Sequence, residues 1–372
     1  MPDFNGSDFN GTMMQFFHGY LPIDDNYWQT VQQRAKALAN AGITALWLPP
    51  VDLSAEPPLC CNQALYCNTI HSLQAHQIAV YADLTLQNPN NQQAWMNWGK
   101  TQLASKINGL RLSLEGFILP QIGDKVMNDW LNALQQLHED LFVFGDSWVD
   151  IETLHGYIDA TSGKLSVLDV PLHYNFHRAS RSGGYYDMRK ILNGTLMQQQ
   201  PALCVTFVEN HLSQPLGMLE SVVESWFKPL AYAIILLRRE GYPCIFYPDY
   251  DGGHYFAIGK DGKEHEIWLD AHRWLLDRFL LARQQFAYGQ QYDYFDHPSV
   301  VGWTRLGNMA HPKTMAVIMS VGWGGSKWME VGKPDAAFYD LTEHIPVPVY
   351  TNEDGWGEFP CRSGSVSVWI EE

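Results

Sequence analysis

Residues 24–48 read DDNYWQTVQQRAKALANAGITALWL, a helix pattern followed at once by a strand pattern. Asp24, Asp25 and Asn26 are candidate N-caps, because their side chains can accept from the first free backbone N–H groups of a helix. The apolar residues of 27–41 recur on one helical face, and Gly42 stands where a helix commonly ends in a left-handed residue. The apolar run Ala45–Leu48 then predicts a buried strand. The stretch is therefore one helix–strand unit of an α/β fold.

The same alternation of short apolar runs and longer amphipathic stretches continues to about residue 285, which indicates parallel strands joined by helices. We expect residues 1–290 to form a (β/α)8 TIM barrel. Two further helices are predicted at Met218–Glu240, kinked by Pro229, and at Trp268–Tyr288. The eight expected strands are Met14–Phe17, Ala45–Leu48, Ala79–Asp83, Gly109–Leu112, Leu141–Phe144, Leu165–Leu168, Cys204–Val208 and Pro243–Tyr247.

The pattern changes after about residue 290, where helical periodicity stops and short β-type runs with glycine-rich turns follow. We expect residues 291–372 to form a C-terminal antiparallel β-sandwich domain. The expected strands are Val300–Thr304, Thr314–Ser320, Ala337–Leu341, Val347–Tyr350 and Val366–Ile370.

The composition excludes several classes of partner. The 372 residues include 40 acidic and 24 basic side chains, a net charge of -16, which argues against nucleic acid and anionic membranes. The first residues carry no basic patch and no apolar core of a signal peptide, so we expect a cytoplasmic protein. A Cys60–Cys67 or Cys61–Cys67 bridge is an alternative, but the missing signal favours free thiols. The six cysteines lack the paired spacing of a structural zinc site.

The stretch Gly109–Ser113 resembles the Gly-x-Arg-x-Asp strand of the alpha-amylase family of glycoside hydrolases, family 13. The resemblance extends over nearly the whole chain, and most strongly over its last eighty or so residues, which resemble the family's C-terminal sandwich. Other stretches that carry it are Met14–His18, Gly42–Pro50, Phe207–His211, Ser225–Ala233, Gly241–Tyr247, Gly302–Arg305, Gly324–Met329 and Asp354–Phe359. It implies a barrel followed by that sandwich.

The resemblance also implies retaining hydrolysis of α-glucans, which needs two carboxyl groups about 5–5.5 Å apart. All three of the family's catalytic carboxylate positions are altered. The nucleophile position holds Ser113, the acid position holds the shorter Asp146 in place of glutamate, and the third position holds Leu212. A serine without an adjacent base is a weak nucleophile. We therefore expect ordinary alpha-amylase catalysis to be lost.

Other family features are replaced as well. The third strand leads to Gln87 and Asn88, where the family has a calcium-ligating asparagine and a substrate histidine. The segment between Asn88 and Gly109 has room for about one helix, Gln92–Ile107, and not for the β-rich subdomain that the family inserts there. We expect no bound metal and no cofactor.

Of five polar or aromatic residues near these positions, four have two interpretations each. Arg111 orients carboxylates, or is an ion-pair partner of Glu209 or Asp146 in the barrel core. Glu115 is a relocated nucleophile, or the first residue of a helix. His211 and Trp148 bind a sugar, or pack in the core. Glu209 replaces a family aspartate and is expected to be structural.

The sequence therefore predicts a non-catalytic protein that binds an α-glucan or maltooligosaccharide, or has a regulatory role. One alternative is an active hydrolase with Asp146 as the acid and Glu115 or Glu209 as the second carboxylate. Another is a scaffold whose barrel face binds a protein partner. Trp303, Trp328, Trp356 and Trp369 are expected in the core of the sandwich rather than in a sugar site.

Overall fold

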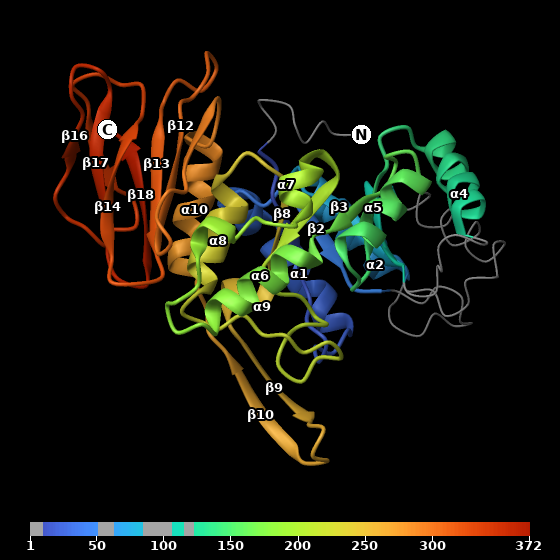
Figure 1. Ribbon diagram of the computed structural model, residues 1–372. Coiled ribbons are helices and arrows are strands. Elements are labelled where there is room, and N and C mark those ends of the chain that lie inside the picture. The colour runs from blue at the N-terminus through green and yellow to red at the C-terminus, as the bar shows by residue number, and fades with distance from the viewer. Residues whose placement is uncertain (1–9, 51–62, 85–105, 115–122) are drawn as a thin grey trace.

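The computed structural model describes residues 10–50, 63–84, 106–114 and 123–372. Eight parallel strands pair in chain order and close into a barrel, which confirms the predicted fold (Figure 1). Each observed strand lies within two residues of its predicted bounds. The strands are β1 (Met13–Gln15), β2 (Ala45–Leu48), β3 (Ala79–Leu84), β4 (Gly109–Ser113), β5 (Phe142–Asp146), β6 (Ser166–Leu168), β7 (Cys204–Phe207) and β8 (Tyr242–Phe246).

Helices surround the barrel, and the first of them forms for the reasons that its sequence gives. The Asp24 side chain accepts from the backbone N–H of Tyr27 at 3.0 Å, and Gly42 ends the helix in the left-handed conformation with φ 100°. The α-helices are α1 (Asp25–Ala41), α2 (Gln63–Ala75), α4 (Gly123–Leu137), α5 (Ile151–Ala160), α6 (Val170–Ser180), α7 (Leu196–Gln199), α8 (Lys228–Leu237), α9 (Tyr247–Asp251) and α10 (Arg273–Gln285). Short 3₁₀ helices η1 (Met188–Lys190) and η2 (Pro201–Leu203) lie between α6 and β7.

Aromatic rings fill much of the barrel interior. Trp47, Phe144 and Tyr81 meet edge to face or tilted, with ring centroids 5.4–6.2 Å apart. Phe142 and Tyr242 pack below them. This interior core is separate from the larger apolar layer between strands and helices. The barrel is therefore packed through its centre, and ligands are limited to its ends.

Two predicted helices are wrong in extent. Residues 218–227 form turns, and α8 begins only at Lys228 with Pro229 in its first turn, so the proline starts the helix instead of kinking it. Trp268 belongs to a strand, and the last barrel helix spans only Arg273–Gln285. In both segments apolar residues outside the helix were counted as part of its face.

The strand that contains Trp268 belongs to a β-hairpin that the sequence did not predict. Antiparallel strands β9 (Gly253–Ile258) and β10 (Glu264–Leu269) form a two-stranded sheet of their own. The hairpin follows α9 and projects from the body of the molecule (Figure 1).

The C-terminal strands form two antiparallel sheets that pack beside α8 and α10 (Figure 1). Six strands pair in the order β11-β12-β13-β18-β15-β16, and β14 pairs with β17. The division into two domains at residue 290 stays a prediction. The strands are β11 (Gln291–Tyr294), β12 (Val300–Arg305), β13 (Met315–Ser320), β14 (Gly325–Glu330), β15 (Ala337–Asp340), β16 (Val349–Tyr350), β17 (Trp356–Cys361) and β18 (Ser365–Glu371).

The tryptophans of these sheets do not share one environment. Trp303 and Trp369 are fully buried, as predicted. The prediction is wrong for Trp328, which is 53% exposed because it occupies an outward position of β14. Trp356 is half-buried.

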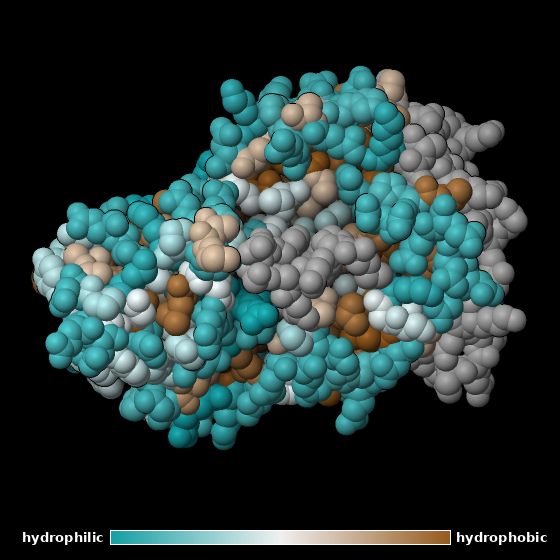
Figure 2. All heavy atoms as spheres, turned by 90° about the horizontal axis from the view of Figure 1, so that it is seen from above, coloured by the Kyte–Doolittle hydropathy of each residue, from teal (hydrophilic) through white to brown (hydrophobic). Residues whose placement is uncertain are grey.

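Polar side chains cover most of the face shown in Figure 2, and apolar ones lie in small patches. Among the described helices, none has the length and apolar character needed to cross a membrane. Cys204 and Cys244 are buried free thiols. The predicted helix Gln92–Ile107 falls mostly outside the described residues, as do Gln87, Asn88, Cys60 and Cys61.

Candidate functional site

Ser113 and Asp146, which the sequence interpretation places at altered catalytic positions, meet at the carboxyl ends of the barrel strands. Ser113 is the last residue of β4 and Asp146 the last of β5, and the register pairs them directly. Asp83 pairs with Arg111 in the neighbouring β3–β4 ladder. Because residues paired in this way point to the same face of a sheet, the four side chains share the barrel mouth.

Arg111 is bound by two carboxylates. Its Nη1 donates to Asp83 Oδ1 at 3.1 Å, and its Nη2 donates to Asp146 Oδ2 at 2.6 Å. The indole of Trp47 lies 5.5 Å from the guanidinium and donates through Nε1 to Asp83 Oδ2 at 2.9 Å. Of the two partners considered from the sequence, the structure pairs Arg111 with Asp146 and not with Glu209.

This cluster is buried, and its two carboxylates stabilise the charged form of the guanidinium. The side chains of Arg111, Asp83 and Asp146 are at most 4% exposed. Burial lowers the pKa of Arg111, but the two carboxylates more than offset this and leave its pKa raised. Within the described residues, the buried Oδ1 of Asp146 has no hydrogen-bond partner, so the cluster leaves one carboxylate oxygen unsatisfied.

His211 lies beside this cluster, between Phe17 and Trp47, whose ring centroids are 5.2 and 5.7 Å away. Gln15 Nε2 lies 3.1 Å from His211 Nδ1, and because that amide nitrogen can only donate, Nδ1 accepts and the proton sits on Nε2. Burial, followed by the charge of Arg111, lowers the pKa of His211 to about 3. His211 is therefore a neutral donor at physiological pH.

Trp148 is held by other rings. It meets His173, Tyr174 and Phe207 edge to face at 5.2, 5.7 and 6.1 Å. The residue is half-buried, and its Nε1 has no hydrogen-bond partner within the described residues. The ring thus has a fixed position and one polar group left to donate.

Glu209 contacts residues other than Arg111. Its Oε1 accepts from Ser213 Oγ at 2.5 Å, and its Oε2 accepts from the Val223 backbone at 3.1 Å and lies 3.6 Å from Lys228 Nζ. Burial raises the pKa of Glu209 to about 7, against the attraction of Lys228. These contacts tie the β7 end to α8 and favour the structural interpretation.

Leu212 occupies the turn after β7, where its backbone N–H donates to Asn210 Oδ1 at 2.8 Å. It brings no polar group to the site. Glu115, the candidate relocated nucleophile, lies outside the described residues.

Sequence reasoning missed Asp83, Trp47 and Gln15 as members of the site. Asp83 could have been found, because it ends the strand next to Arg111 and a buried arginine needs a carboxylate. Gln15 gave no signal, since its role depends on a turn almost two hundred residues later.

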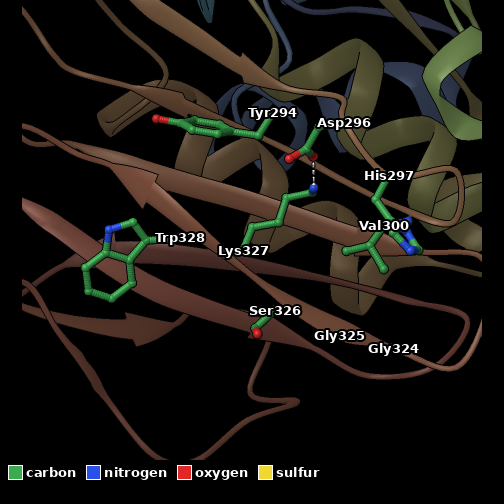
Figure 3. Close-up of a pocket in the computed structure, with 9 residues that line it drawn as sticks. All are labelled: Tyr294, Asp296, His297, Val300, Gly324, Gly325, Ser326, Lys327 and Trp328. Atoms are coloured by element: carbon green, nitrogen blue, oxygen red, sulfur yellow. Dashed lines mark hydrogen bonds and ion pairs between the residues drawn. The ribbon is translucent and has the colours of Figure 1, made fainter.

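A separate pocket of about 430 Å³ opens between β14 and the segment that follows β11, and none of its lining residues belongs to the barrel. Lys327 points from β14 toward Asp296 and forms an ion pair with it, while Trp328 turns to the side (Figure 3). The other lining residues are Tyr294, His297, Val300, Gly324, Gly325 and Ser326.

Known proteins share this architecture and sequence. The model described as Alpha-amylase C-terminal matches residues 315–370. The alpha-amylase of Geobacillus stearothermophilus is 34% identical over an alignment of 489 residues, which covers 97% of this chain and 87% of that protein. This chain belongs to the alpha-amylase family. The cytoplasmic alpha-amylase of Escherichia coli K12 is 39% identical over 282 residues, 75% of this family member and 55% of the relative.

Solved structures support the fold of this alpha-amylase family member. The crystal structure of CldA, a cyclomaltodextrin glucanotransferase, superposes with a TM-score of 0.68 at 15% identity and covers 96% of this chain and 98% of that one. At this identity the match speaks for the fold alone.

Proposed function

We propose that this member of the family binds α-1,4-glucan at the barrel mouth and does not carry out ordinary retaining hydrolysis. The observation that supports this most is the pairing of Ser113 with Asp146, where the reaction needs two carboxyl groups. A general acid must also give up a proton, whereas the Oδ2 of Asp146 accepts a hydrogen bond from the guanidinium of Arg111.

Groups suited to a sugar remain at the mouth. His211 has an N–H at Nε2, Asp146 Oδ1 and Trp148 Nε1 are buried groups without a hydrogen-bond partner among the described residues, and Trp148 adds a half-buried ring. Sugar hydroxyls need such convergent donors and acceptors beside apolar surface. Relatives are named alpha-amylase and, from Bacillus sp. (strain 707), glucan 1,4-alpha-maltohexaosidase, which supports an α-glucan or maltooligosaccharide as the ligand.

The length of the alignments supports a more open cleft. An alignment of 489 residues against a chain of 372 requires long gaps in this chain, as the absence of an inserted subdomain would produce. The relative named cytoplasmic alpha-amylase supports a cytoplasmic location.

The second candidate is an active α-glucan hydrolase with Asp146 as acid and Glu115 or Glu209 as the second carboxylate. The names of relatives 33–40% identical favour hydrolysis over binding alone. The contacts of Glu209 with Ser213 and Lys228 count against its part in this candidate and leave Glu115 as the stronger choice.

Two measurements separate the candidates. Release of reducing ends from soluble starch is compared for the wild type and Asp146→Ala. Activity that Asp146→Ala abolishes establishes the hydrolase, and no release from either protein supports binding alone. Calorimetric titration with maltoheptaose then tests binding, with His211→Ala expected to weaken it. Absence of heat from the wild type contradicts a glucan site.

A further inference from the structure

We propose that the outer edge of β9 pairs with the same edge of a second copy of this chain, so that two hairpins form one four-stranded antiparallel sheet. The inference is independent of glucan binding. It rests on the sequence of β9, on the exposed face of the hairpin and on the register that two copies can adopt.

The β9 strand has an unprotected edge. Residues 253–258 read GHYFAI and contain neither a formal charge nor a proline. Among the described residues, β10 is the one strand that pairs with β9, so the backbone groups of its other edge are free of ladder bonds. Natural proteins usually protect such edges with lysine or proline, and an uncharged edge is a template for another strand.

One face of the hairpin also exposes three apolar side chains, beside Glu264 and Glu266, which the register pairs with Ile258 and Phe256. Phe256, Ile258 and Trp268 are 53%, 65% and 70% exposed. His254 stacks on Trp268 with centroids 3.9 Å apart, which extends the apolar surface across both strands. A two-stranded ribbon is marginally stable in water, whereas a wider sheet with a continuous apolar face is stable.

The opposite face of the hairpin is already used by its own chain. Tyr255 stacks on Tyr20 at 4.6 Å and donates to the Pro215 carbonyl at 2.6 Å. These contacts fix the base of the hairpin against the rim of the barrel. The arm is therefore held in one position at its base and projects from the body of the molecule (Figure 1).

Antiparallel pairing about a two-fold axis at Phe256 is self-complementary. It sets Phe256 opposite its own copy and His254 opposite Ile258. Lys260 of each hairpin then stands opposite the uncharged Gly252 of the other. The β10 edge fits less well, because Glu264 and Glu266 would approach the same residues of the second copy.

Charge also selects this edge. Two chains of net charge -16 repel each other, and the uncharged β9 is where they can approach closely. The oligomeric state is measured by analytical ultracentrifugation up to about 100 µM, a range in which weak dimers populate. We expect a dimer for the wild type. Phe256→Glu should weaken dimerisation by about 100-fold or more, because two carboxylates would meet at the axis.

The decisive sample mixes two variants. Phe256→Glu and Phe256→Lys should each be monomeric alone and should form a heterodimer when mixed, since opposite charges then meet at the axis. Met309→Glu, at a fully exposed turn residue, is the matched control and should leave the dimer intact. A monomeric wild type, a dimer that survives Phe256→Glu, or a mixture that stays monomeric would each overturn the proposal.

Discussion

The guanidinium of Arg111 lies 2.6 Å from Asp146 and shares its other amino group with Asp83 at 3.1 Å. One buried cation therefore fixes the carboxylate of Asp146, the residue predicted to stand at the family's acid position. In this arrangement Asp146 is mainly an ion-pair partner of Arg111. The strand ends keep this arrangement although the residue that pairs with Asp146 on β4 is Ser113.

Removal of the cation should destabilise the fold. Arg111→Met leaves two buried carboxylates without their shared partner, and we expect the free energy of unfolding to fall by about 3–5 kcal/mol. Urea denaturation at pH 7 measures this. Arg111→Lys retains the charge but cannot reach both carboxylates in the same geometry, so it should fall between the wild type and Arg111→Met. A loss below about 1 kcal/mol for Arg111→Met would contradict the role of the ion pairs.

The strands of the barrel could be predicted because each is a short apolar run between amphipathic helices. Both faces of such a strand are buried, so its residues are apolar throughout and do not alternate with polar ones. The hairpin could not. Its strands alternate in exposure, and the apolar residues Phe256 and Ile258 face water and were assigned to no element, while Trp268 was taken as the start of a helix. Pro229 was similarly placed inside a helix that it begins.

The site could be predicted in part. Chain order alone places Ser113 beside Asp146, since β4 and β5 are neighbours in any barrel of this kind. The contacts of Glu209 with Ser213 and Lys228 could not be predicted, because these two residues reach it from a turn and from α8. Sequence patterns locate strand ends well, but they do not show which way a polar side chain turns there.

Restoring the lost carboxylates should create activity if binding alone is the present function. We expect the combined variant Ser113→Asp, Asp146→Glu, Leu212→Asp to release reducing ends from starch about 100-fold faster than the wild type, since reacting groups misplaced by about 1 Å cost that much. The matched control carries Ser113→Asn, Asp146→Gln and Leu212→Asn, which have similar shapes and no charge. Equal rates for the two variants would show that more than the carboxylates was lost.

His173 should make stability depend on pH. It is fully buried, with one ring nitrogen 2.8 Å from the Val208 carbonyl and the other 2.8 Å from Ser221 Oγ, and burial lowers its pKa to about 4. As pH falls below about 6.5 the unfolded chain takes a proton that the folded chain refuses, so stability decreases until about pH 4. His173→Gln can keep both hydrogen bonds without titrating. Between pH 7 and pH 4.5 it should lose about 2 kcal/mol less than the wild type in urea denaturation. Parallel losses would show that His173 is protonated in the folded state.

Gly42 tests the helix end on which the sequence interpretation began. Its φ of 100° disfavours any side chain, and a Cβ there would lie 1.9 Å from Nε2 of Gln284, which belongs to α10. Because the Gln284 side chain can move, we expect Gly42→Ala to cost about 1–2 kcal/mol, from backbone strain and the displaced amide together. Gly194→Ala is the matched control, since Gly194 has φ 68° and open space around its would-be Cβ. Thermal unfolding should therefore show a larger loss for Gly42→Ala than for Gly194→Ala, whereas equal losses would mean that α1 and α10 do not pack closely at this point.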